Sequence, residues 1–389
     1  MNRELGGKTE ADHATEYRSV LREAVLARMR ARGPVAIGVS GGLDSSSIAA
    51  LAVSIARDGL APMPVLVTTR YPGLACDESA FSSRLAEHLE RPLRYIDAPE
   101  HGYEPPEPRE IYYDPSFQLW QRMLDACRSD RVYAHLTGMG SDEIMWSTGF
   151  EVEDAVLDRD FPLAARFAGI YEDPSAWRAW RRLGGAVKRS LQSQRRGPRR
   201  GERVRIPDWA TPLAAGLIGR AREERRAKSR SLFHSHTSRE RIAVELAFGS
   251  QCPFGIAQYV QYGPHLGVDI RNPFYDNRVV ELALALPVGI RDSLDVSKPL
   301  LRKAIEPLLP PSLVWRTHGA EFTSFFRSAF HSHENLTRRF FGESRLEALG
   351  VVRPGALLRL LETGRSHPEQ TRELLATFAY EAWVRKLEG

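Results

Sequence analysis

The sequence has few cysteines and no long apolar run. Cys76, Cys127 and Cys252 are odd in number and widely spaced, which indicates neither a disulfide framework nor a Cys/His zinc site. No apolar stretch approaches the length that crosses a bilayer, and the first residues lack the hydrophobic segment of a signal peptide. We therefore expect a cytoplasmic protein without a membrane partner.

Acidic residues are scarce in one segment. Between Arg178 and Arg205, eleven lysines and arginines accompany a single acid, Glu202. Such a basic segment, 178–205, could attract nucleic acid, an anionic partner or an acidic peptide, although a solvated surface segment is the commoner case. With 389 residues, 42% of them hydrophobic, the chain can bury the core of one large domain or of two closely packed ones.

A strand, a glycine turn and a helix are expected near the start of the chain. The run from Val35 to Val39 is apolar and rich in β-branched residues, and apolar residues recur at helical spacing after Ser45. Glycine N–H groups, serine hydroxyls and a helix N-terminus favour an anion, so we predict a phosphate site. The predicted phosphate-binding residues are Ser40, Gly41, Gly42, Ser45 and Ser46.

Asp44 stands among these donors, where a carboxylate repels phosphate unless a cation lies between them. Mg²⁺ is the simplest such cation, and a helix cap is the alternative function of Asp44. No Gly-Lys-Ser/Thr follows at the spacing of a Walker loop. The segment 40–46 instead resembles the pyrophosphate-binding loop of ATP pyrophosphatases, a superfamily that cleaves ATP between the α- and β-phosphates. This resemblance implies adenylation of a substrate.

Helical and strand patterns alternate over the first third of the chain. After a polar tail, residues 1–15, the patterns predict an α/β fold, a doubly wound parallel sheet with helices on both faces. The nucleotide-binding core is predicted over 16–150, and a mostly helical, substrate-side part over 151–389. The predicted helices are 16–32, 45–59, 77–89, 116–128, 239–248, 279–286, 299–309 and 369–387, and the predicted strands are 35–39, 64–69, 93–98 and 132–136.

A second glycine loop follows the predicted strand 132–136. It combines glycines with two carboxylates, Asp142 and Glu143, at the carboxyl end of a parallel strand, where ligands bind in open α/β sheets. A glycine turn with two helix-capping acids is the alternative.

Asparagine synthetases carry a similar pair of loops in the same order, and the segments 267–276, 297–302 and 309–316 resemble segments of that family. The resemblance implies an ATP-dependent amide-forming enzyme with the adenine nucleotide alpha hydrolase-like fold, in which Asp44 and Asp142 hold Mg²⁺. The resemblance further implies contacts between adenosine and the backbone near Val39, Thr69, Thr137 and Gly138. Glu143, Arg271 and Asp276 are expected on the substrate side, although a structural salt bridge between Arg271 and Asp276 is equally open.

Three departures from that family bear on the substrate. Met139 replaces an acid that lies next to aspartate in asparagine synthetase, and a thioether cannot bind an ammonium group as a carboxylate does. The synthetase-like part begins near residue 16, so we expect no ammonia from a glutaminase domain on this chain. His318 aligns with a lysine that neutralises pyrophosphate; either it replaces that lysine or it is a surface histidine, and Lys298 and Arg302 are further candidates.

Several later segments resemble lasso-peptide cyclases, which adenylate an Asp or Glu side chain of a precursor peptide before the N-terminal amine closes a macrolactam. The matching segments are 205–209, 316–323, 345–355 and 380–385. The resemblance implies a leader-binding protein and a leader peptidase as partners, or a separate subunit for the N-terminal domain. Trp177, Trp180, Trp209 and Tyr259 are candidates for peptide contact or for the core.

Three other functions stay open at this point. A small-molecule amide or β-lactam synthetase, with ammonia or a partner glutaminase, requires a small carboxylate. An ATP pyrophosphatase acting on tRNA requires salt-dependent RNA binding. The segments after residue 266 that resemble asparagine synthetases argue against this function. A non-catalytic binding module is favoured by the changes at Met139 and His318, whereas the retained aspartates and loop serines favour chemistry.

Overall fold

The computed structural model describes residues 8–98, 117–145, 151–171, 177–193, 206–232, 266–317 and 334–364, together with single residues between 237 and 263, at 319 and 325, and between 374 and 387. Five parallel strands form one sheet in the order β3-β2-β1-β4-β5. The strands are β1 (Val35–Gly38), β2 (Val65–Arg70), β3 (Leu93–Asp97), β4 (Ala134–Leu136) and β5 (Asp269–Arg271).

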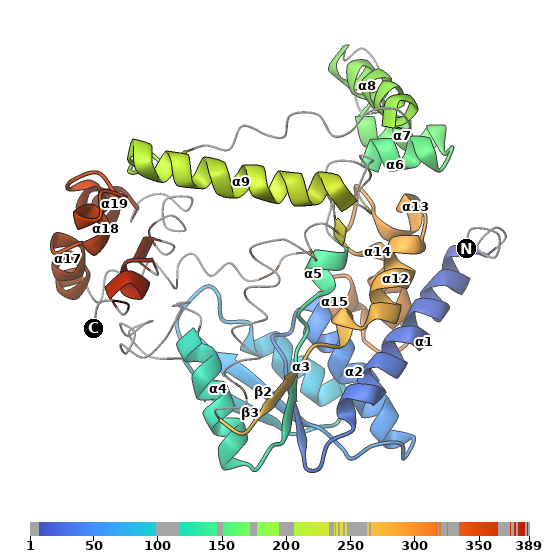
Figure 1. Ribbon diagram of the computed structural model, residues 1–389. Coiled ribbons are helices and arrows are strands. Elements are labelled where there is room, and N and C mark those ends of the chain that lie inside the picture. Colours follow the sequence, from blue (N-terminus) through green and yellow to red (C-terminus); the bar gives the residue numbers. More distant parts are fainter. Residues whose placement is uncertain are drawn as a thin grey trace.

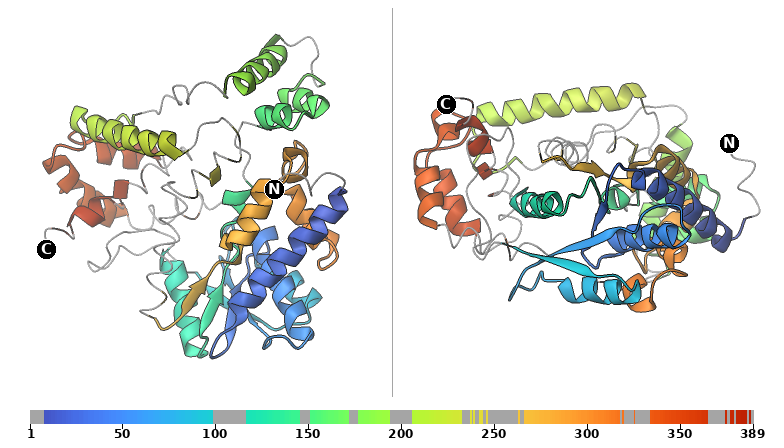
Figure 2. Two further views of the ribbon diagram at one scale, coloured as in Figure 1. Left: turned by 45° about the vertical axis from the view of Figure 1, so that its right-hand side comes forward. Right: turned by 90° about the horizontal axis from the view of Figure 1, so that it is seen from below.

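Helices cover both faces of this sheet, as predicted. On β1, Val35 and Ile37 face a core with helices α1, α2 and α3, whereas Ala36 faces a second core with Leu124 of α4 (Figures 1 and 2). This alternation is what strands buried on both faces require. The helices of this part are α1 (Glu10–Met29), α2 (Leu43–Arg57), α3 (Ser79–His88), α4 (Phe117–Ser129) and the short α5 (Ser141–Ile144).

Helix α1 begins earlier than the sequence predicts. Thr9 caps it and pairs reciprocally with Asp12 in a capping box, so the helix starts at Glu10. The predicted tail 1–15 is therefore too long, because the pattern of apolar residues, which begins only at Tyr17, conceals a polar first turn.

The predicted core 16–150 omits part of the sheet. β5 pairs with β4, and the helices that follow β5 pack on α1 in the main core. A three-residue strand is too short for a visible alternation, so the sequence did not reveal it. The elements that follow β5 are η1 (Pro273–Tyr275), α12 (Asn277–Ala285), α13 (Val288–Arg291), α14 (Pro299–Ile305) and α15 (Pro311–Val314).

The rest of the described chain is helical. One group comprises α6 (Glu151–Leu157), α7 (Phe161–Ala168) and α8 (Trp177–Ser193); the other comprises α17 (Glu334–Gly342), α18 (Arg345–Ala348) and α19 (Ala356–Gly364). Figure 1 shows α9 (Pro212–Leu232) extending to the second group, which lies apart from the sheet. Of the predicted helix 239–248 the structure describes residues 239, 242, 243 and 246, and of 369–387 it describes ten residues between 374 and 387; all of these are helical.

The basic segment is exposed where the structure describes it. Arg178, Arg181, Arg182 and Lys188 are exposed on α8, while residues 194–205 lie outside the described part. Trp177 and Trp180 of the same helix are 71% and 53% exposed and so do not belong to a core. Trp209 packs against the C-terminal helices, and Tyr259 lies outside the described residues. Among the described helices, none has the length and apolar character required to cross a membrane.

Candidate active site

The order of the strands creates the site. The chain reverses its winding between β1 and β4, and in open α/β sheets the ligand crevice lies at the carboxyl ends of the two strands where this happens. Each of these strands ends in one of the two predicted glycine loops. The sheet therefore brings together two segments almost 100 positions apart.

The first loop is held open by its own side chains. The Ser45 hydroxyl accepts the Ser40 N–H at 3.1 Å and also contacts the Ser40 hydroxyl at 3.1 Å. Gly41 has φ +74°, and a Cβ there would lie 2.4 Å from Phe81 Cβ, so only glycine fits. Helix α2 then starts at Leu43 with Gly42 as its N-cap, and Asp44 stands in the first turn. The N-cap is thus not Asp44, so the carboxylate of Asp44 is available for contacts in the site.

The second loop packs directly on the first. A Cβ on Gly138 would lie 2.6 Å from the backbone nitrogen of Ser45, so the backbones meet where only glycine is small enough. The Thr137 hydroxyl donates a hydrogen bond to Asn272 after β5 and accepts one from the Met139 N–H at 3.2 Å. The strand β5, which the sequence did not reveal, therefore supports this loop.

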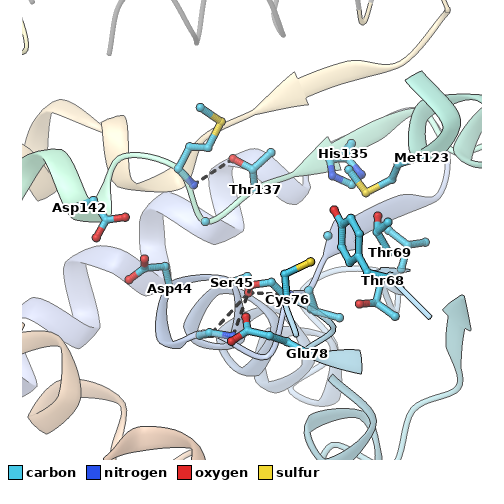
Figure 3. Close-up of a pocket in the computed structure, with 18 residues that line it drawn as sticks. Asp44, Ser45, Thr68, Thr69, Cys76, Glu78, Met123, His135, Thr137 and Asp142 are labelled. Carbon is cyan, nitrogen blue, oxygen red and sulfur yellow. Dashed lines mark hydrogen bonds between the residues drawn. The ribbon is translucent and has the colours of Figure 1, made fainter. Parts of the chain in front are cut away.

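A cavity of about 580 Å³ opens between the two loops. Figure 3 shows the carboxylates of Asp44 and Asp142 at one side of it, and Met123 and His135 at the other. Ten of the predicted site residues line this cavity: Val39, Ser40, Gly42, Asp44, Ser45, Thr69, Thr137, Gly138, Met139 and Asp142. Eight further lining residues were not predicted from the sequence: Gly38, Val67, Thr68, Tyr71, Cys76, Glu78, Met123 and His135.

At the acidic side, one ammonium group joins the two aspartates. Lys298 Nζ lies 2.6 Å from Asp44 Oδ2 and 2.6 Å from Asp142 Oδ1. Burial alone would lower the pKa of Lys298, but Asp44 and Asp142 outweigh burial and raise it, so Lys298 is a cation. Burial raises the pKa of Asp44, an effect that Lys298 opposes. Both carboxylates thus converge on one point of positive charge.

This convergence suits Mg²⁺ bound together with phosphate. Mg²⁺ is commonly held by one or two carboxylates, with phosphate oxygens and water completing its coordination. Among the described residues no group of three or more His, Cys, Asp or Glu side chains is arranged to hold a metal ion. Asp44 and Asp142 are the residues that would hold it.

Besides Lys298, five other predicted site residues do not line the cavity. Ser46 is fully buried in α2, and Gly41 contributes backbone behind the loop. Glu143 accepts a hydrogen bond from the Gly140 N–H at 3.1 Å and caps α5, the alternative that the sequence left open; burial raises its pKa. Arg271 and Asp276 complete the five.

Arg271 and Asp276 have structural partners other than each other. Arg271 binds Asp269 and the carbonyls of Arg28 and Arg30, and Asp276 pairs with Arg28 and Arg278 while capping α12. These contacts attach β5 and α12 to the end of α1. The structure therefore gives both side chains a positioning part in the fold. His318 lies outside the described residues.

Arg302 likewise has a structural place. Its guanidinium donates to the carbonyls of Ser297, Val314 and Arg316, the first at 2.6 Å and the last at 3.0 Å. It thus holds together the two ends of the segment 297–316 and does not reach the cavity.

The other side of the cavity is apolar and uncharged. Figure 3 shows Met123 and His135 there, and Tyr71 and Cys76 also line the cavity. Burial raises the pKa of the Cys76 thiol, so no thiolate nucleophile is present there. Burial lowers the pKa of His135 to about 4, which makes its imidazole neutral at pH 7. A neutral, partly aromatic wall of this kind suits an uncharged heterocycle.

The buried His135 predicts a loss of stability in acid. Its pKa is about 4 in the fold against 6.5 normally, so the unfolded chain binds the proton more tightly. The contribution of neutral His135 to the free energy of unfolding is then fully present above pH 6.5, and it falls by about 3 kcal/mol as the pH drops to 4. Urea unfolding of the wild type and His135→Asn at pH 7, 5.5 and 4 measures this, and the variant should show the flatter pH dependence. His88→Gln, at an exposed histidine, is the control; equal slopes in all three proteins would contradict the prediction.

Comparison with known families decides what kind of protein carries this site. The family described as asparagine synthase matches residues 16–385, nearly the whole chain. The chain belongs to the asparagine synthase family. No curated protein matches the chain in a sequence comparison. The resemblance seen in the two loops is thereby confirmed, and membership of the asparagine synthase family implies an ATP-dependent ligase.

The cavity fits the nucleotide that the asparagine synthase family uses. It combines loop amides and hydroxyls, two carboxylates directed at one cation, and an uncharged wall at the opposite side. Phosphates beside the first loop would place the base at the wall of Met123 and His135. The two ends of the cavity therefore differ in chemical character as the phosphates and the base of a nucleotide do.

Proposed function

We propose that this protein adenylates a carboxylate and lets an amine displace AMP, and that the product is a macrolactam ring in a ribosomally made peptide. The observation that carries the proposal is the convergence of Asp44 and Asp142 on a single cation at the phosphate side of the cavity. The substrate carboxylate attacks the α-phosphorus, a P–O bond forms, and the bond to pyrophosphate breaks. The amine then attacks the acyl carbon, and AMP leaves.

In this reaction the chain contributes position and charge. Bound Mg²⁺ would neutralise phosphate charge beside Asp44 and Asp142. The amides and hydroxyls of the first loop hold the β- and γ-phosphates, so the α-phosphate faces the second loop. Lys298, already beside both aspartates, is close enough to neutralise charge that develops on pyrophosphate. Positioning and electrostatic stabilisation account for most of the rate enhancement in such phosphoryl chemistry.

The lining of the cavity supports a substrate other than free aspartate. A free amino acid carries an ammonium group and an α-carboxylate beside the reacting group. An acidic side chain is needed to bind the first, and a lysine or arginine to bind the second. Met139 stands on the second loop, and no lysine or arginine is among the described lining residues. A side-chain carboxylate within a peptide needs neither contact. The peptide also brings its own N-terminal amine, so ammonia is not needed.

The C-terminal segments that resemble lasso-peptide cyclases form one structural unit. The Arg353 N–H donates to the Trp209 carbonyl at 2.9 Å, and buried Glu381 accepts from the Ser344 hydroxyl and from the N–H groups of Arg345 and Leu346. Three of the four segments thus meet around one small core. This supports a shared architecture with such cyclases. The leader-binding protein, leader peptidase and separate subunit remain proposed partners.

ATP–pyrophosphate exchange with Mg²⁺ tests the proposal. The protein is given a leader-free precursor peptide with an internal Asp or Glu, the same peptide with Asn or Gln in its place, or free small acids. Exchange that needs the internal carboxylate supports the proposal, and mass spectrometry should then show the loss of one water from the peptide. Exchange with free acids alone would favour a small-molecule amide synthetase. Absence of exchange with every carboxylate, while ATP binds, would favour a binding module.

A further inference from the structure

Arg316 lies behind the first loop, and the sequence analysis assigned it no function. It follows α15, and its Nη1 donates to the carbonyl of Gly41 at 3.3 Å. Its guanidinium stacks over the ring of Phe81 with 3.8 Å to the ring centroid. It also forms an ion pair with Glu78, and the two side chains are only 16% and 14% exposed.

Glu78 connects this arginine to the cavity. The described lining contains three acids, Asp44, Glu78 and Asp142, and no lysine or arginine. Each of the three is paired with a cation from the segment 298–316: Lys298 for the two aspartates and Arg316 for Glu78. A polyphosphate entering this cavity would face three carboxylates. Binding therefore needs the paired cations to turn toward the phosphates or new cations to arrive.

The contacts of Arg316 place it where it can exchange its carboxylate partner for phosphate. The Arg302 guanidinium holds its carbonyl at 3.0 Å, the stacking fixes its plane, and the Gly41 carbonyl binds one of its nitrogens. Its Nη2 pairs with Glu78, an acid that lines the cavity. A guanidinium presents a planar fork that matches two phosphate oxygens as well as it matches two carboxylate oxygens. Exchange of partner thus requires little movement.

We propose that Arg316 binds the β- and γ-phosphates of ATP, and that Glu78 is the partner it leaves when the nucleotide enters. The inference rests on the proposed function, because it concerns the same ATP site. Glu78 keeps the guanidinium neutralised in the free protein and competes with phosphate for it. Removing Arg316 and removing the charge of Glu78 then have opposite effects on nucleotide binding. A purely structural ion pair would make both changes harmful.

The test compares ligands that differ only in phosphates. Binding of Mg-ATP, pyrophosphate, AMP and adenosine is measured by calorimetry for the wild type, Arg316→Gln, Arg316→Lys and Glu78→Gln. We expect Arg316→Gln to weaken Mg-ATP and pyrophosphate about tenfold or more while AMP and adenosine change less than about twofold. Arg316→Lys should recover part of the loss. Glu78→Gln should tighten Mg-ATP a few-fold.

A matched control exists in the C-terminal helices. Arg385 also stacks on a phenylalanine, Phe340, at 4.4 Å and also pairs with a glutamate, Glu381, but Glu381, unlike Glu78, does not line the cavity. Arg385→Gln should leave the affinities for all four ligands unchanged. Equal weakening of adenosine and Mg-ATP by Arg316→Gln, or weaker Mg-ATP binding in Glu78→Gln, would overturn the inference. If the wild type binds neither Mg-ATP nor adenosine, the proposed function itself fails.

Discussion

Asp44→Asn is expected to lower the rate of ATP–pyrophosphate exchange about a thousandfold, while the protein remains folded. The substitution keeps the size of the side chain and removes its charge. Among the described residues, Asp44 and Asp142 are the two carboxylates that meet Lys298 Nζ, each at 2.6 Å, so the loss of the Asp44 charge removes half of the anionic pair that is suited to Mg²⁺. Initial rates of exchange at saturating Mg²⁺ and peptide measure the effect.

Asp58→Asn is the control for this prediction. Asp58 ends the same helix α2, where it is exposed and pairs with Arg22 at 2.5 Å, away from the cavity. Its substitution should leave the exchange rate within about twofold, because exposed ion pairs contribute little. A second check is the Mg²⁺ dependence: Asp44→Asn should need much more Mg²⁺ for half-maximal exchange. If Asp44→Asn kept most of the wild-type rate, the two aspartates would not be the metal-binding pair.

The two glycine loops of the site could be predicted from the sequence because their determinants are local. The first loop needs glycine at Gly41 for a positive φ, and the second needs Gly138 because the backbones of the two loops meet there. Such requirements can be recognised in the sequence as short motifs of a few residues. The parallel strands then bring the loops together, which the alternation of helices and strands was sufficient to predict.

The remaining features depend on contacts between distant segments. Arg271 and Glu78 look alike in sequence as charged residues near motifs, but one attaches β5 to the end of α1 and the other lines the cavity. Lys298 and Asp44 are more than 250 positions apart in the sequence, and only the folded structure shows that the Lys298 ammonium group contacts Asp44. Met123 of α4 and His135 of β4 line the opposite wall, and Cys127 of α4 contacts His135 at 3.7 Å. An apolar residue such as Met123 carries no sequence signal that distinguishes a cavity wall from a core.

Arg291→Met is expected to lower the free energy of unfolding by about 3–5 kcal/mol. Arg291 Nη2 lies 3.2 Å from Asp154 Oδ2, and each side chain is 2% exposed. The pair joins α13 to α6, so it attaches the helices 151–193 to the part of the chain that packs on the sheet. Burial lowers the pKa of Arg291, an effect that Asp154 opposes, and methionine would leave the buried carboxylate without this cation.

Two further variants separate the buried charge from simple loss of packing. The double variant Arg291→Met/Asp154→Leu should recover most of the lost stability, because an apolar pair of similar volume removes the desolvated charge altogether. Arg166→Met removes an exposed partner of Asp295, with 52% and 67% of the two side chains accessible, and should cost less than about 1 kcal/mol. Urea unfolding at pH 7 compares the four proteins. If the loss of Arg291 destabilises the protein through the buried Asp154 carboxylate, removing that carboxylate must restore stability. A double variant no more stable than Arg291→Met would therefore mean that Arg291 acts mainly through the packing of its aliphatic stem.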